Sequence, residues 1–307
     1  MAQRLRCTSV GLAVTLAVLV ATLAWIPPAH ANGVRFLDEV FAGITTIKDA
    51  VYGHAVDSQG VRRALTLDVH QPAGDTATTR PAVVWIHGGY FTRGSKEDYP
   101  DVWRQFARAG YVTASINYRL DPTIPESAAD IVAANRLDDY FHEVRDAQHD
   151  AQAAIRWLRA NAAAFRVDPA RIAVAGHSAG GIITNAVAFN EEDPGSSGNP
   201  GYPSRVAAAV AMSGGAVPTK TVTVGANEPP LLVVHGLADA TVPYAVAAPA
   251  CALTILRGNV CEQVLDPDAG HVPLALPAVR EFLYRRIFHP SGTVSPTRLK
   301  IVRTHPL

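Results

Sequence analysis

Residues 171–189 read RIAVAGHSAGGIITNAVAF, and the rest of the chain can be organised around this stretch. The apolar run at 172–175 is typical of a buried strand, and the apolar run at 182–189 is typical of a helix. Between them, GHSAG at 176–180 matches the pattern G-x-S-x-G. A strand that turns at once into a helix strains its turning residue, and small flanking residues let the two elements approach closely. The sequence therefore predicts that Ser178 stands at a sharp strand-to-helix turn.

The pentapeptide alone is a weak signal, because glycine and serine are common in ordinary turns. It gains weight from the strand before it and the helix after it, both of which the motif requires. The free N–H groups and the positive dipole end of the new helix would also favour a developing negative charge beside Ser178. Ser178 is therefore a candidate nucleophile, provided that other segments supply a base, an acid and further N–H donors.

Strands and helices alternate along most of the chain. The continuous apolar run at 82–86 is typical of a central parallel strand, whereas the alternating pattern at 64–70 is typical of an antiparallel strand with one wet face. Further strands are predicted at 50–56, 111–117, 172–175, 206–212, 231–235 and 261–265, and helices at 102–109, 139–165, 182–189 and 276–288. This order predicts an α/β fold with a mostly parallel central sheet flanked by helices. Residues 121–138 are irregular and are expected to form a loop or at most a small lid.

Composition and charge limit the classes of partner. The 307 residues are 48% hydrophobic and 18% charged, which is globular composition, and the formal net charge of zero does not favour nucleic acid. At the start of the chain, Arg4 and Arg6 precede an uncharged apolar run at 10–26, and Ala-His-Ala at 29–31 fits a cleavage site. Residues 1–31 are therefore expected to be a secretory signal peptide, with an uncleaved membrane anchor as the alternative.

The expected organisation is a signal peptide at 1–31, one folded domain at 32–289 and a loose tail at 290–307. On this interpretation the mature protein is secreted, to the extracellular space or the periplasm. It is expected to bind no nucleic acid and to have no stable membrane association once the signal is cleaved.

The cysteine count suggests a disulfide. Cys7 would be lost with the signal peptide, which leaves Cys251 and Cys261 as an even pair in a chain bound for an oxidising compartment. These two are expected to form a disulfide, and two free buried thiols are the alternative. No second pair or histidine cluster lies at zinc-ligand spacing, so no metal is expected.

Polar residues follow several of the predicted strands, at the carboxyl ends where function gathers in parallel sheets. A serine hydroxyl is a weak nucleophile until a base takes its proton, and histidine is the usual base because its pKa lies near neutrality. His271 follows the last predicted strand and is the candidate base. Asp239 is the candidate acid that orients it, since the chain order Ser…Asp…His is a known arrangement. Asp266 and Asp268 are the alternatives by proximity.

Other residues near the strand ends have supporting roles in this interpretation. His177 is expected to face outward or to support the loop, and His87 and His235 are expected to be structural. An oxyanion needs two or more fixed N–H donors. The predicted donors are Ala179, at the start of the helix, and Gly88 and Gly89, after the strand at 82–86.

Five segments together resemble a known family: HGGY at 87–90, NYRL at 117–120, DPARIAVAGHSAGG at 168–181, HGLADATVP at 235–243 and GH at 270–271. They are similar to the α/β-hydrolase superfamily, above all to the lipase, carboxylesterase and hormone-sensitive-lipase-like branches that carry HGGG. The matched segments lie between about residues 63 and 288 of the chain. The resemblance implies the α/β-hydrolase fold and the following roles: nucleophile Ser178, acid Asp239, base His271, and oxyanion donors Gly88, Gly89 and Ala179.

The resemblance also implies that Arg119 braces the oxyanion loop and that no cofactor is needed. Tyr90 departs from the family pattern, because it stands where many members have a third glycine, and it would narrow or line the acyl pocket. The implied function is a secreted serine hydrolase of carboxylic esters. Because no long apolar lid is visible, short-chain or small soluble esters are favoured.

Three other functions remain open from the sequence. An exopeptidase of the prolyl-oligopeptidase type shares the order of the three residues, but such proteins usually add a large propeller or cap. A dienelactone-type or polymer esterase would act on a special ester. A hydrolase fold without catalysis could serve for binding, although the intact Ser178, Asp239 and His271 argue against it.

Overall fold

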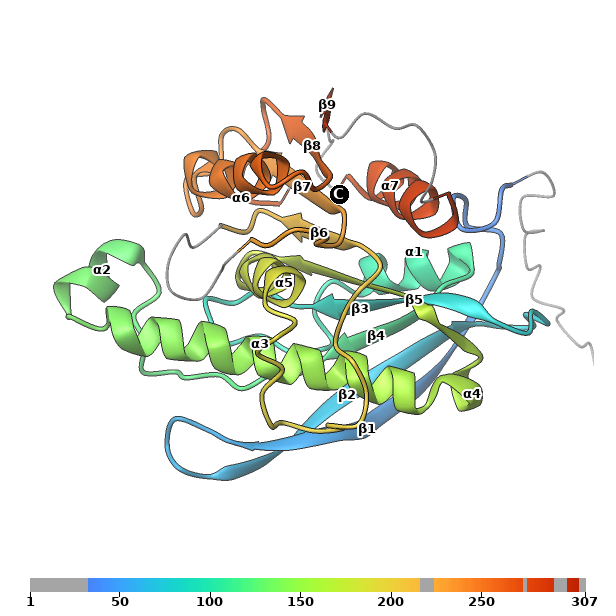
Figure 1. Cartoon of the computed structure of the whole chain (residues 1–307), viewed down its shortest axis with the longest axis horizontal. Coiled ribbons are helices and arrows are strands. Elements are labelled where there is room, and N and C mark those ends of the chain that lie inside the picture. Colours follow the sequence, from blue (N-terminus) through green and yellow to red (C-terminus); the bar gives the residue numbers. More distant parts are fainter. Residues whose placement is uncertain (1–32, 216–223, 273–274, 290–296, 304–307) are drawn as a thin grey trace, which may run out of the picture.

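The computed structural model describes residues 33–215, 224–272, 275–289 and 297–303. The expected signal peptide at 1–31 lies outside these residues. A nine-stranded sheet with the order β1-β2-β4-β3-β5-β6-β7-β8-β9 forms the centre (Figure 1). The strands are β1 (Ile44–Val56), β2 (Arg62–Pro72), β3 (Arg80–Ile86), β4 (Val112–Ile116), β5 (Val167–His177), β6 (Ala209–Met212), β7 (Leu231–Gly236), β8 (Cys261–Asp266) and β9 (Thr297–Ile301).

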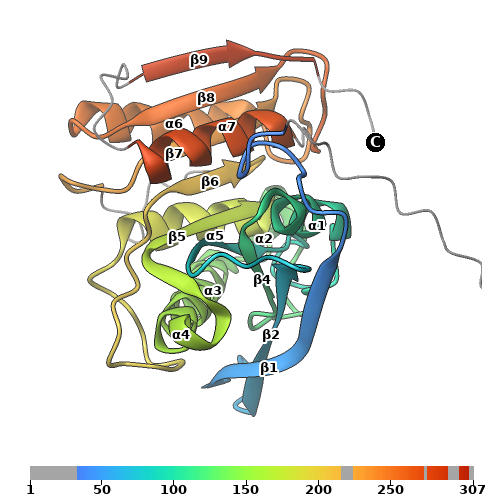
Figure 2. The same ribbon diagram turned by 90° about the vertical axis from the view of Figure 1, so that its right-hand side faces the viewer.

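The sheet is antiparallel at one edge and parallel elsewhere. β1 pairs with β2, and β2 with β4, in the antiparallel sense, and the other neighbouring strands pair in parallel. Figure 2 shows β1 at one edge of the twisted sheet and β9 at the other. The helices are α1 (Pro100–Ala109), α2 (Ala128–Ala133), α3 (Leu137–Ala160), α4 (Ala162–Phe165), α5 (Ala179–Phe189), α6 (Tyr244–Leu256) and α7 (Leu276–Phe288). The predicted α/β fold with a mostly parallel sheet is confirmed.

Two hydrophobic cores lie on the two faces of the sheet. In β3, Ala82, Val84 and Ile86 point into the core beneath α3, α5 and α6. Val83 and Trp85 point into the opposite core, beneath α1 and α7. Because successive residues of a strand point to opposite faces, a central strand covered on both sides must be apolar throughout, as this one is.

Besides α2, two elements were not predicted from the sequence. α6 contains Pro249 and is apolar on most sides, so it lacks the clear stripe that identifies a surface helix. β9 lies within 290–307, where a loose tail was expected, and the structure corrects that expectation. The strand pairs in parallel with β8 although all five of its residues are exposed. An exposed strand shows no alternation of apolar and polar residues, so its pattern resembles a loop.

Residues 121–138 form a small lid rather than a plain loop, because they contain α2. Ser127 caps this helix: its side chain accepts a hydrogen bond from the Asp130 backbone N–H at 3.1 Å. The long helix expected at 139–165 is two helices, α3 and α4, which are separated at Asn161. Within the described ranges, none of the helices has both the length and the apolar character needed to cross a bilayer.

A disulfide joins Cys251 in α6 to Cys261, the first residue of β8, with a Cα–Cα distance of 5.4 Å. It ties the helix to the strand that precedes the candidate base. A closed loop of this size contributes roughly 3 kcal/mol of stability in the chain-entropy model.

Candidate active site

Ser178 occupies the sharp turn between β5 and α5. Its φ of 58° and ψ of −120° are strained for a residue with a side chain. The turn is held from both sides, because the Ser178 N–H donates to the carbonyl of Met212 at 2.9 Å and Gly180 packs against the end of β3. A Cβ on Gly180 would lie 2.1 Å from the Ile86 carbonyl oxygen, so this close approach requires glycine.

Three predicted side chains converge at the carboxyl ends of the parallel strands. The Ser178 Oγ lies 2.9 Å from Nε2 of His271, and Nδ1 of His271 lies 2.8 Å from Oδ2 of Asp239. They follow β5, β8 and β7 respectively, so the sheet brings together residues far apart in sequence. The Asp239 side chain is fully buried, whereas the His271 side chain is 21% exposed and reachable by a substrate. These are distances at which a proton can pass between serine and imidazole.

Asp239 is held as an anion. Its Oδ1 accepts the backbone N–H groups of Thr241 and Val242, both at 2.9 Å. Burial acts to raise the pKa of Asp239, but the hydrogen bond from His271 and those from the two backbone N–H groups outweigh it and lower the pKa below its ordinary value. A fixed carboxylate of this kind sets the tautomer of His271, with the proton on Nδ1 and the lone pair of Nε2 facing Ser178.

The two alternative acids have other partners. Oδ1 of Asp266 accepts the backbone N–H groups of Asp268 at 3.0 Å and Ala269 at 3.2 Å, which shapes the turn that leads to the candidate base. Asp268 forms an ion pair with Arg303 at 3.2 Å. The geometry therefore favours Asp239.

His177 supports the loop that carries His271. It is buried, and its Nε2 N–H donates to the backbone carbonyl of His271 at 2.7 Å. Burial is the main cause that lowers the pKa of His177 to about 4, so the ring is neutral at neutral pH. Of the two expectations for this residue, facing outward is wrong and supporting the loop is right.

His235 and His87 also have structural positions, as predicted. The Nε2 N–H of His235 donates to the carbonyl of Val242 at 2.8 Å, next to Asp239. Nδ1 of His87 lies 2.6 Å from the carbonyl of Gly88. Both rings are buried in the wall of the site.

The predicted oxyanion donors surround the serine. A Cβ on Gly88 would lie 3.0 Å from the Cβ of Ser178, which shows how closely this loop approaches the nucleophile. Gly89 has a φ of 113°, and a Cβ there would lie 2.1 Å from the Arg93 carbonyl oxygen. In the described part of the chain, the N–H groups of Gly88, Gly89 and Ala179 have no hydrogen-bond acceptor. They are free to bind an oxyanion.

Tyr118, rather than its neighbour Arg119, braces the oxyanion loop. The Tyr118 ring stacks on His87 with centroids 4.3 Å apart, and its hydroxyl donates to the His87 carbonyl at 3.2 Å. The Arg119 guanidinium instead binds Asp150 at 2.8 Å and Asp146 at 2.7 Å, both on α3. The expectation for Arg119 is therefore corrected. The fully buried carboxylate of Asp150 needs a cation, and Arg119 supplies it.

Two family models match neighbouring parts of the chain. One, described as alpha/beta hydrolase fold, matches residues 141–240, and the other, described as BD-FAE, matches residues 67–137. The solved structure of a thermophilic esterase from Thermogutta terrifontis is similar, with a TM-score of 0.62 and 24% sequence identity over 80% of this chain and 94% of that chain. This chain therefore has the α/β-hydrolase fold.

Curated relatives match part of this chain. Carboxylesterase NlhH of Mycobacterium tuberculosis is 37% identical over 116 residues, which are 38% of this chain and 31% of that protein. Esterase LipI of the same species is 32% identical over 146 residues, 43% of this chain and 40% of that protein. The chain thus spans less than half the length of these relatives.

Ser178 lines a cavity of about 580 Å³, here called the apolar cavity. Tyr90 and Phe91 line it from the oxyanion loop, so Tyr90 is a wall residue as expected. The other apolar side chains come from the lid, from α3, α5 and α6, and from the loop after β7: Ile131, Val132, Leu137, Tyr140, Phe141, Ile182, Val242 and Val246. Sequence reasoning missed the lid residues, because the irregular segment that carries them has no periodicity.

The lid is tied to the oxyanion loop. Glu126 forms an ion pair with Arg93 and accepts a hydrogen bond from the Thr92 hydroxyl at 3.1 Å. The Arg93 guanidinium also lies over the Tyr90 ring, 5.2 Å from its centroid. Within the described residues, no three histidine, cysteine or acidic side chains are grouped to hold a metal ion.

Proposed function

We propose that this protein is a serine esterase that hydrolyses carboxylic esters through an acyl-enzyme on Ser178. The observation that carries the proposal is the continuous chain of hydrogen bonds from Asp239 through His271 to Ser178, next to unoccupied backbone N–H donors. The names of the relatives, carboxylesterase and esterase, agree with this chemistry.

The geometry suits each step of the reaction. As the Ser178 Oγ attacks the ester carbonyl, its proton passes to Nε2 of His271, and the buried Asp239 carboxylate stabilises the imidazolium that forms. The N–H groups of Gly88 and Ala179 bind the oxyanion, and losing one such donor typically costs about 3 kcal/mol in the barrier. His271 then gives the proton to the departing alcohol. Water releases the acid in a second round of the same steps.

The shape and lining of the apolar cavity support short-chain or small soluble esters as substrates. The cavity is about 580 Å³ in volume, and its lid carries only one short helix, α2. Such a cavity holds an acyl chain of modest length by hydrophobic contact, at about 0.8 kcal/mol for each buried methylene. We also propose that residues 1–31 direct secretion. The amino-terminal residue of the exported protein should then be Asn32, which amino-terminal sequencing tests.

The test is hydrolysis of p-nitrophenyl esters from acetate to laurate by the wild type and by Ser178→Ala. The proposal predicts turnover that is best for the shorter esters and is abolished in the variant. The matched control is Ser204→Ala, which removes a buried hydroxyl that has no hydrogen-bond partner in the described chain and should leave turnover intact. Retained hydrolysis by Ser178→Ala would refute the assignment.

A further inference from the structure

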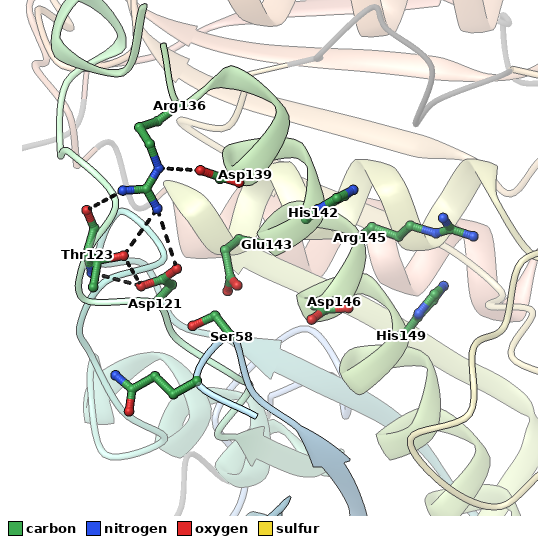
Figure 3. Close-up of a pocket in the computed structure, with 11 residues that line it drawn as sticks. Ser58, Asp121, Thr123, Arg136, Asp139, His142, Glu143, Arg145, Asp146 and His149 are labelled. Carbon is green, nitrogen blue, oxygen red and sulfur yellow. Dashed lines mark hydrogen bonds and ion pairs between the residues drawn. The ribbon is translucent and has the colours of Figure 1, made fainter. Parts of the chain in front are cut away.

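A second cavity, of about 600 Å³, lies on another face of α3 and is here called the polar cavity. Figure 3 shows it between α3, the turn that carries Ser58, and the segment that carries Asp121 and Thr123. We propose that the polar cavity binds a primary ammonium group, with the Glu143 carboxylate as its charged partner. This site is separate from the reaction of Ser178, and the proposal goes beyond the esterase function.

Glu143 is the group that points to a ligand. The residue is only 4% exposed, and its Oε2 is buried with no hydrogen-bond partner among the described residues. In Figure 3 its carboxyl points from α3 toward Asp121 and Ser58. Buried polar groups are almost always paired, because an unpaired carboxylate in a protein interior is costly. The orphaned carboxyl therefore indicates a missing partner on the cavity side.

The arginines around the polar cavity are already paired, and His142, which precedes Glu143 on α3, also lines it. Arg119 binds Asp146 and Asp150. Arg136 forms an ion pair with Asp139 and lies 4.0 Å from Asp121.

At the far end of the cavity, Arg145 and His149 both pair with Asp193, at 3.0 Å and 3.2 Å. Among the described residues, no cation forms an ion pair with Glu143.

A proton takes the place of the missing cation in the free protein. Burial raises the pKa of Glu143 to about 8, and the negative charges of Asp146, Asp121 and Asp150 add to the effect, while Arg119 opposes it. A bound cation would reverse this balance, so its entry should release the proton.

The chemistry of the cavity wall selects among cations. An ammonium group has three N–H donors. The wall of the cavity offers acceptor oxygens from the carboxyls of Glu143 and Asp121 and from the hydroxyl of Ser58, which itself hydrogen-bonds Asp121. Figure 3 shows these three residues on the same side of the cavity. A metal ion would need several ligand atoms at close spacing, and the described residues contain no such group of three. An anion would be repelled by the carboxylates. A primary ammonium fits best.

The test is isothermal titration calorimetry of the full chain with n-butylammonium chloride, with butan-1-ol as the neutral isostere and tetramethylammonium as a cation without N–H donors. We expect n-butylammonium to bind and the other two to bind at least tenfold more weakly. Titrations in two buffers of different ionisation enthalpy should show the release of nearly one proton near pH 7. Affinity should rise about tenfold or more from pH 6.5 to pH 8.5, as Glu143 ionises.

Two variants complete the test. Glu143→Gln keeps the shape of the side chain, and it should lose the proton release and at least tenfold in affinity. Glu191→Gln removes a carboxylate that pairs with Arg205 at the surface, and it should bind like the wild type. If Glu143→Gln folds poorly, the affinity of Asp121→Asn for n-butylammonium and the proton release of the wild type test the proposal instead. Equal binding by Glu143→Gln, equal binding of butan-1-ol, or no proton release would overturn the proposal.

Discussion

The apolar cavity and the polar cavity have nearly the same volume, about 580 Å³ and about 600 Å³, and both use the first half of α3. Tyr140 and Phe141 line the first, whereas Asp139 and Glu143 line the second. Beside the apolar cavity, the charged groups have partners: Asp239 binds His271 in the relay that ends at Ser178, and Glu126 pairs with Arg93. In the polar cavity, the carboxyl of Glu143 has no hydrogen-bond partner among the described residues. The volume of a cavity therefore does not indicate what it binds. The hydrogen-bond and ion-pair partners of the polar groups in its wall are more informative.

The largest expected effect is on the relay of the apolar cavity. Asp239→Asn should lower kcat for p-nitrophenyl acetate by about 10⁴-fold, because the amide favours the wrong tautomer of His271. The free energy of unfolding should change much less, since the substitution keeps the shape of the side chain. Asp101→Asn, on the exposed side of α1, is the control and should leave kcat unchanged. A decrease in kcat of less than tenfold would mean that another acid orients His271.

A smaller effect is expected from His177, a positioning residue that acts through the backbone of His271. His177→Ala should lower kcat by about 10- to 100-fold with little change in KM. The reason is that the His271 backbone loses the hydrogen bond from His177 that fixes its position relative to Ser178. His177→Gln keeps an N–H donor at a similar distance and should recover part of the loss. If KM rose while kcat stayed constant, His177 would shape the substrate cavity instead.

His177, next to Ser178, and Glu143, in the polar cavity, should change the stability of the protein in opposite directions as the pH changes. The pKa of His177, lowered to about 4, contributes stability that is present above about pH 6.5 and is lost as the pH falls toward 4. The pKa of Glu143, raised to about 8, contributes stability that is present at acid pH and is lost as the pH rises through about 8. Each group changes the free energy of unfolding by at most about 1.4 kcal/mol per pH unit.

Urea unfolding of the wild type and of Glu143→Gln at pH 5, 7 and 9 measures the second contribution. The variant lacks the titrating carboxyl, so the wild type should lose stability relative to it as the pH rises. A difference that stays constant from pH 5 to pH 9 would show that the pKa of Glu143 is not raised in the folded protein.

Much of the fold was predictable from the sequence because its signals are local. The apolar run at 82–86 and the strand-to-helix turn at Ser178 identify the centre of the sheet and its carboxyl edge. α6 and β9 escaped prediction, since a helix that is apolar on most sides and a strand that is exposed throughout lack the periodic pattern on which prediction depends.

The residues of the candidate site that directly follow a predicted strand could be predicted from the sequence. The residues whose contribution depends on tertiary packing could not. Ser178, Asp239 and His271 each follow a strand, so the sheet had to bring them to one edge. Support of the loop by His177 was one of two expectations, but its partner, the His271 carbonyl, could not be predicted. The bond from Tyr118 to the His87 carbonyl was not predicted either, because no sequence pattern records hydrogen bonds to backbone carbonyls of distant segments. The orphaned carboxyl of Glu143 is visible only once its neighbours are placed.

The central claim is that the Ser178 hydroxyl is an activated nucleophile, and peptide mass spectrometry after reaction with a fluorophosphonate tests it most directly. The account predicts one phosphonyl adduct on the peptide that contains Ser178, formed much more slowly in His271→Ala and absent in Ser178→Ala. An unlabelled Ser178 in a protein that hydrolyses esters, or an adduct on a different residue, would contradict it.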